Sequence, residues 1–145
     1  MVREMINPPI AAGTDVWLVA AGEYVAGVCN IGPEEIRRRR MAGHVGLAGA
    51  LGLLAVLVAS GAPAPARLLV VAPAAISAAG YMQARSRFCA NYGWRGIFNV
   101  GAVGDAVGVE DAAARAADRR RARQIGLQSF GIGLVAGIAA MLLPI

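Results

Sequence analysis

One uncharged apolar stretch limits most strictly what this chain can fold into. Residues 41–62 (MAGHVGLAGALGLLAVLVASGA) carry no side chain that is charged at pH 7, and they follow directly on Arg37, Arg38, Arg39 and Arg40. As an α-helix this stretch is about 33 Å long, and the hydrocarbon core of a bilayer is about 30 Å thick. We therefore expect a transmembrane helix whose arginine end stays in the cytoplasm.

Two further stretches are apolar and long enough to cross a bilayer. Residues 68–84 form a short second span, in which Pro73 predicts a mild kink or a late helix start. Residues 125–145 form the third span. The stretch 109–124 before it is rich in alanine, begins with acidic residues and ends with arginines, so its charges suit a helix dipole at both ends. We expect one helix to run from this stretch into the third span.

These spans define the fold class that we predict, an all-α polytopic membrane protein in a single domain, with an N-terminal interfacial segment and a cytoplasmic helix leading into the third span. All but one of the 14 basic residues fall on one side of this layout, and Arg67 alone lies at the outer edge. This asymmetry predicts a cytoplasmic N-terminus and an outer C-terminus. The parts are an N-terminal cytoplasmic or interfacial segment at 1–40, spans at 41–62, 68–84 and 125–145, and a cytoplasmic loop with an arginine-rich helix at 85–124.

The segment before the first span is expected to lie at the membrane surface. Residues 16–28 are too short to span and contain Glu23, so they form either a short interfacial helix or a buried packing segment. A helix should begin at Pro33, because Gly32 can serve as its N-cap and acidic residues follow. Arginines and tryptophans near the span ends are expected to anchor the chain at the surface: Arg37, Arg38, Arg39, Arg40, Trp17, Trp94, Arg119, Arg120 and Arg121.

Small residues recur four positions apart in the spans. Candidates for close helix contacts are Gly46 with Ala50, Ala48 with Gly52, and Gly133 with Gly137, because helices in lipid associate by close backbone approach. Alanine and glycine are so common here that such spacing also arises by chance. The partner helix cannot be identified from the spacing.

Few side chains in this sequence suggest chemistry. Cys29 and Cys89 both lie near span roots on the predicted cytoplasmic side, with His44 one turn inside the first span. A thiol or metal site formed by these three is one reading, and two semi-buried small hydrophobic residues with a histidine that contacts a neighbouring helix is the other. No intramembrane Asp, Glu, Lys or Arg and no nucleotide-binding, metalloprotease or hydrolase motif is found. We predict no cofactor and no nucleic-acid binding.

Two segments resemble a group of short, uncharacterised bacterial membrane proteins. They are Cys29-Asn30-Ile31-Gly32-Pro33-Glu34-Glu35-Ile36 before the arginine block, and Phe88-Cys89 followed by Arg95-Gly96-Ile97-Phe98-Asn99. The resemblance carries no activity, but it implies a location in the inner membrane of a bacterium. It also implies that both cysteine-containing motifs contribute to one cytoplasmic site.

The leading functional hypothesis is a non-enzymatic accessory or scaffold protein. It would pack against itself or another membrane protein through small-residue helix faces and contact anionic lipid headgroups through its arginines. A thiol-based redox or metal-binding protein that uses Cys29 and Cys89 is one alternative. A small oligomeric channel or exporter is another.

Overall fold

Three long helices and a small folded base make up the protein. A computed structural model describes residues 23–144. Its elements in chain order are helix α1 (Pro33–Ala59), the 3-10 helix η2 (Ala64–Val70), α2 (Val71–Ser86), α3 (Ala90–Arg95), strands β1 (Ile97–Phe98) and β2 (Val107–Gly108), and α4 (Ala112–Leu142).

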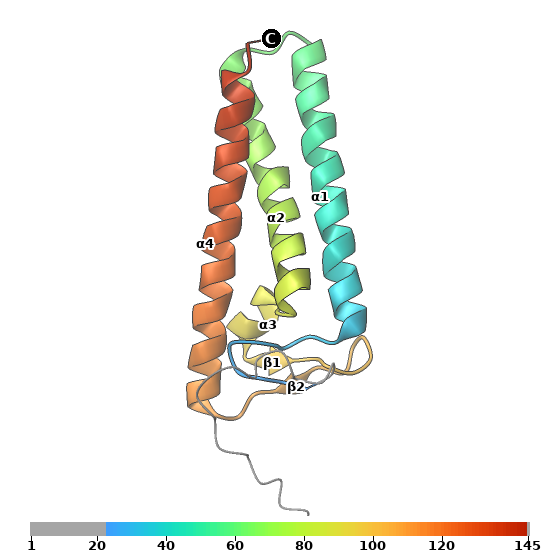
Figure 1. The fold of residues 1–145 in the computed structure, drawn as a ribbon, viewed down its shortest axis with the longest axis vertical. Coiled ribbons are helices and arrows are strands. Elements are labelled where there is room, and N and C mark those ends of the chain that lie inside the picture. The colour runs from blue at the N-terminus through green and yellow to red at the C-terminus, as the bar shows by residue number, and fades with distance from the viewer. Residues whose placement is uncertain (1–22, 145) are drawn as a thin grey trace, which may run out of the picture.

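Helix α2 lies between α1 and α4 and packs on both of them (Figure 1). The loop from α1 to η2 and the end of α4 lie at one end of the bundle. The first residues of α1 and α4 lie at the other end, together with α3 and both strands. We call residues 24–32 and 87–111, which gather there, the basal cap.

Three helices of the described chain are long and apolar enough to cross a membrane: Pro33–Ala59, Ala64–Ser86 and Ala112–Leu142. Many of their largest apolar side chains face outward, for example Val45, Leu127 and Val135, which are each about two-thirds exposed. Exposure of so many large apolar side chains is unfavourable in water and favourable in lipid. The fold therefore fits a multi-pass membrane protein.

The helix starts follow the local sequence. Helix α1 begins at Pro33 after Gly32, as predicted, and continues without a break through the arginine block. In the second span the chain is a 3-10 helix up to Val70 and α-helical from Val71, so Pro73 falls in the first α-helical turn, where its missing N–H leaves few backbone bonds unmade. This is the late helix start that proline predicted.

Helix α4 is one continuous helix of 31 residues from the arginine-rich stretch into the third span. It begins at Ala112, a few residues later than expected, because Asp111 is its N-cap and accepts a hydrogen bond from Ala114 N at 2.7 Å. At the other end, Arg67 Nη1 donates to the carbonyl oxygen of Leu143 at 2.9 Å. The buried Arg67 side chain thus ties η2 to the last turn of α4.

The all-α prediction omits a small sheet. Strands β1 and β2 pair antiparallel, with Ile97 opposite Gly108 and Phe98 opposite Val107. They lie within residues 85–124, for which a cytoplasmic loop and an arginine-rich helix were expected. Strands of two residues are too short for alternation of apolar and polar side chains to reveal them.

Only part of the expected interfacial segment 16–28 belongs to the described residues, and Trp17 lies outside them. From Val25 to Cys29 the chain makes a tight turn closed by backbone hydrogen bonds, with Gly27 at φ +71°. This turn packs against α4, where a Cβ on Gly27 would lie 3.4 Å from Ala117 Cβ.

Candidate functional site

The two cysteine-containing motifs meet at the centre of the basal cap. Asn30, which is fully buried, donates from Nδ2 to the carbonyl oxygen of Cys89 at 3.1 Å and accepts at Oδ1 from Cys89 N at 2.6 Å. Its own N–H donates to Arg87 O, and its carbonyl accepts from Asn99 N at 2.9 Å. One asparagine therefore joins the segment before α1 to two others: the segment from Arg87 to Cys89 at the end of α2, and the segment that contains Asn99 after β1.

A second buried asparagine continues this network. Ile31 and Asn99 form a parallel bridge, and Gly32 N donates to Asn99 O at 2.8 Å. The Asn99 side chain accepts from Gly101 N and donates to Ala102 O, which closes the turn after β1. Glycine is needed at position 32, since a Cβ there would lie 2.6 Å from the Val100 carbonyl oxygen.

A buried carboxylate binds the first described turn to α4. Asp118 is fully buried and accepts from Gly27 N at 2.6 Å and from the Tyr24 hydroxyl at 2.9 Å. Tyr24 also stacks on Phe98, with ring centroids 4.5 Å apart. Burial, with help from the Asp118 carboxylate, raises the pKa of Tyr24, so this phenol keeps its proton and its donor role.

Glu35 forms another buried polar centre at the start of α1. Its side chain is 1% exposed and accepts from Arg38, Arg39 and the Tyr92 hydroxyl at 3.3 to 3.5 Å. Burial first, and then the neighbouring Glu35, raise the pKa of Tyr92. The carboxylate thus joins α3 to α1, and it also pairs with two arginines of the block.

Both cysteines of the candidate thiol site lie in the basal cap. Cys29 and Cys89 are buried and free, and the Asn30 side chain holds their segments together. Burial raises the pKa of the Cys29 thiol, which is the opposite of what an activated cysteine needs. Among residues 23–144 no three His, Cys, Asp or Glu side chains group in a way that could hold a metal ion. His44 instead contacts Tyr81 of α2, with its Nδ1 2.6 Å from the hydroxyl.

A pocket of about 360 Å³ opens beside the first turns of α1. Three arginines line it, Arg37 and Arg40 from α1 and Arg87 from the end of α2. We call it the arginine pocket, and its other lining residues are Cys29, Ile31, Gly32, Pro33 and Ile36.

Glycines set the distance between α1 and α2. Gly80 lies against the backbone of Gly43, and a Cβ on Gly80 would meet Gly43 N and Arg39 O. A Cβ on Gly46 would lie 2.6 Å from Ser77 N, and Ser77 Oγ donates to Gly43 O at 2.9 Å. The prediction named Gly46 and missed the contact between Gly43 and Gly80. These two glycines lie on different helices, so no fixed spacing in the sequence relates them.

The contact between α2 and α4 uses the predicted pair in the third span. A Cβ on Gly133 would lie 2.7 Å from Val71 O, and one on Gly137 would overlap the Val71 side chain. Ala50 is buried beside α2. Gly52 differs, since a Cβ there would meet nothing within 4 Å in the described chain, so Gly52 makes no helix contact within it.

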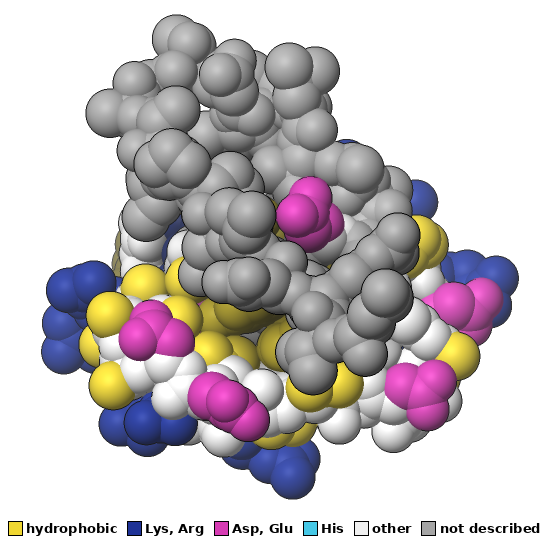
Figure 2. Space-filling model, turned by 90° about the horizontal axis from the view of Figure 1, so that it is seen from below, with side chains coloured by type: hydrophobic (Ala, Val, Ile, Leu, Met, Phe, Trp, Pro, Cys, Tyr) yellow, Lys and Arg dark blue, Asp and Glu magenta, His cyan; other side chains and the backbone are white. Residues whose placement is uncertain are grey.

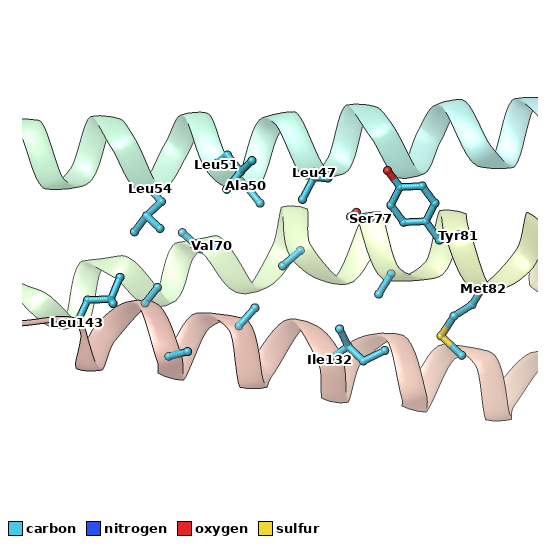
Figure 3. Close-up of a pocket in the computed structure, with 15 residues that line it drawn as sticks. Leu47, Ala50, Leu51, Leu54, Val70, Ser77, Tyr81, Met82, Ile132 and Leu143 are labelled. Carbon is cyan, nitrogen blue, oxygen red and sulfur yellow. The ribbon is translucent and has the colours of Figure 1, made fainter.

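An apolar groove of about 550 Å³ runs along the bundle between α1 and α4, with α2 as its floor (Figure 3). Leu47 and Leu54 of α1 face Ile132 of α4 and Leu143, the residue after α4, across it. The other lining residues are Ala50, Leu51, Val70, Ala74, Ser77, Ala78, Tyr81, Met82, Ala136, Ala139 and Ala140.

The proposed surface anchors within the described residues lie around the base of the bundle. Arginine side chains project around the rim when the molecule is seen from below, with acidic side chains between them (Figure 2). Arg119 and Arg120 are exposed, and Trp94 is about half exposed.

Comparison with known proteins identifies no relative: no protein-family profile, curated protein or solved structure matches this chain. The fold defines its class as a bundle with three helices able to span a membrane.

Proposed function

We propose that this chain is a non-enzymatic integral membrane protein that serves as an accessory or scaffold component of a homo-oligomeric or larger membrane assembly. It lies in the inner membrane of a bacterium, with the N-terminus and basal cap in the cytoplasm and the C-terminus outside. The arginine distribution around the base supports this orientation, because positive charge resists translocation.

The apolar groove is the observation that carries this proposal. α1 and α4 both pack on α2 through glycines, and a groove of about 550 Å³ is lined by all three helices. In lipid, helices associate by close packing, and a groove between three helices offers a fourth helix more contact than any flat face does. We infer that a transmembrane helix of a second copy or of another membrane protein occupies it.

A bulky side chain in the groove tests this function. Ala139 is an exposed residue of α4 that lines the groove, so Ala139→Trp places a large ring in the groove without replacing a buried residue of the bundle. Val56 is 64% exposed and lines none of the pockets described here, which makes Val56→Trp the matched control.

Chemical crosslinking in native membranes, followed by extraction in mild detergent, reads the outcome. We expect the native chain and Val56→Trp to crosslink to a second copy or to a partner, and Ala139→Trp to lose that product. A native chain that stays monomeric and partner-free, or an Ala139→Trp variant that assembles normally, would contradict the proposal.

A further inference from the structure

The arginine pocket holds more positive charge than its neighbours balance. Of its three arginines, only Arg37 has a carboxylate within ion-pair distance in residues 23–144, the exposed Glu34 at 3.5 Å. The buried Glu35 pairs with Arg38 and Arg39, neither of which lines this pocket. Guanidinium groups gathered without carboxylates favour an anion between them.

Arg87 is held in place by an unusual backbone conformation. It is the one non-glycine residue of the described chain with a positive φ, at +52°, a region that glycine or asparagine adopts more readily. The carbonyl oxygen of Arg87 accepts from both Asn30 N and Ile31 N, so the basal cap fixes this conformation. Arg87 is the C-cap residue of α2, and this fixed conformation places it in the lining of the arginine pocket with Arg37 and Arg40.

The position of the pocket indicates what kind of anion it takes. Arg40 directly precedes the apolar stretch that starts at Met41, so the pocket lies at the depth of lipid headgroups. Its other wall is apolar, formed by Ile31, Pro33 and Ile36. A small soluble anion gains nothing from contact with an apolar wall, whereas a phospholipid presents a phosphate next to its glycerol and acyl carbons.

We propose that the arginine pocket binds the phosphate group of an anionic phospholipid. Arg37, Arg40 and Arg87 donate to the phosphate oxygens, and the glycerol and upper acyl carbons lie against the apolar wall. The proposal rests on the membrane placement above but not on a helix in the groove. It differs from general surface attraction because it assigns binding to one pocket.

Native mass spectrometry of the full chain in detergent, titrated with phosphatidylglycerol, tests the site. The pocket variant combines Arg40→Gln with Arg87→Gly, since glycine suits the backbone at position 87. The control combines Arg85→Gln with Arg123→Gln, which removes the same charge from exposed arginines outside the pocket. Circular dichroism verifies folding, and if the double variant is unfolded, Arg87→Gly alone is compared with Arg85→Gln.

We expect the native chain to bind phosphatidylglycerol about tenfold more tightly than phosphatidylcholine. The pocket variant should lose about fivefold in affinity for each arginine removed, and the control less than about twofold in total. Equal losses in both variants, or equal binding of the two lipids, would overturn the proposal. Displacement of the lipid by millimolar inorganic phosphate would assign the pocket to free phosphate instead. The same spectra record the oligomeric state, so a failure of the assembly proposal is seen separately.

Discussion

Asn30 pairs with the backbone of Cys89 through both polar atoms of its side chain, at 2.6 and 3.1 Å, although 59 residues separate them. The amide reproduces the hydrogen bonds that a neighbouring strand would supply. Because the Asn30 segment leads into α1 and Cys89 follows α2, this pair fixes how the bases of the two helices meet. The basal cap is therefore held together by specific long-range hydrogen bonds and is more than a connection between spans.

Replacement of Asn30 by Leu should destabilise the protein strongly. The buried N–H and carbonyl of Cys89 would lose partners, at about 1–3 kcal/mol for each group left unsatisfied. Urea unfolding in detergent micelles measures the loss. Asn91→Leu is the control, because Asn91 is exposed in the short helix α3. The interpretation would be wrong if the two variants were equally stable.

Addition of one methyl group at Gly80 should separate α1 from α2. Gly80→Ala places a Cβ against the backbone of Gly43, which cannot move aside as a side chain can, so we expect a loss of about 1–3 kcal/mol in unfolding free energy. Gly126→Ala adds the same methyl group to a helix position with nothing within 4 Å and should be neutral or slightly stabilising. Thermal unfolding of both variants shows whether a loss of stability at position 80 comes from the close helix contact or from the effect of a Gly→Ala change on helix propensity.

Neutralisation of Glu35 should loosen the joint between α1 and α3. Glu35→Gln removes the charge that holds Arg38 and Arg39, and since both arginines remain partly in solvent we expect a modest loss of about 1–2 kcal/mol. Glu34→Gln, on an exposed pair, should change stability by less than about 0.5 kcal/mol. Similar stabilities for these two variants would show that burial of Glu35 is unimportant.

The Cys29 thiol should react slowly. Burial raises its pKa, so the unfolded chain releases this proton first as the pH rises. Stability from the neutral buried thiol is therefore complete below the ordinary thiol pKa and is lost as the pH rises through the raised value. At pH 8 we expect iodoacetamide to modify Cys29 at least about tenfold more slowly in the folded protein than in urea, as measured by peptide mass spectrometry. Rapid modification in the folded protein would favour the thiol-based alternative.

Local signals in the sequence predicted the long elements well. Proline, glycine and acidic residues located the start of α1 at Pro33, and Pro73 located the change from 3-10 to α-helix. The continuous helix from the arginine-rich stretch into the third span was also predicted, apart from residues 109–111, the last of which is its N-cap. These features depend on neighbouring residues, which a single sequence displays.

The basal cap could not be predicted in the same way. Nothing in the spacing of Asn30 and Asn99 shows that each bonds to distant backbone, and the two-residue strands leave no periodic pattern. The resemblance did suggest that both cysteine motifs share a site. It did not reveal that asparagines carry the contact, or that Arg87 joins the pocket from the end of α2.

Cysteine accessibility in intact cells tests the central claim, that three helices cross the membrane with the basal cap in the cytoplasm. Ser60→Cys lies in the loop after α1, and Val103→Cys is exposed between β1 and β2, each in a chain whose native cysteines are replaced by Ala. A membrane-impermeant maleimide should label the cysteine at position 60 in intact spheroplasts and the one at position 103 only after lysis. Labelling of both from the same side, or recovery of the chain in the soluble fraction without detergent, would contradict the account.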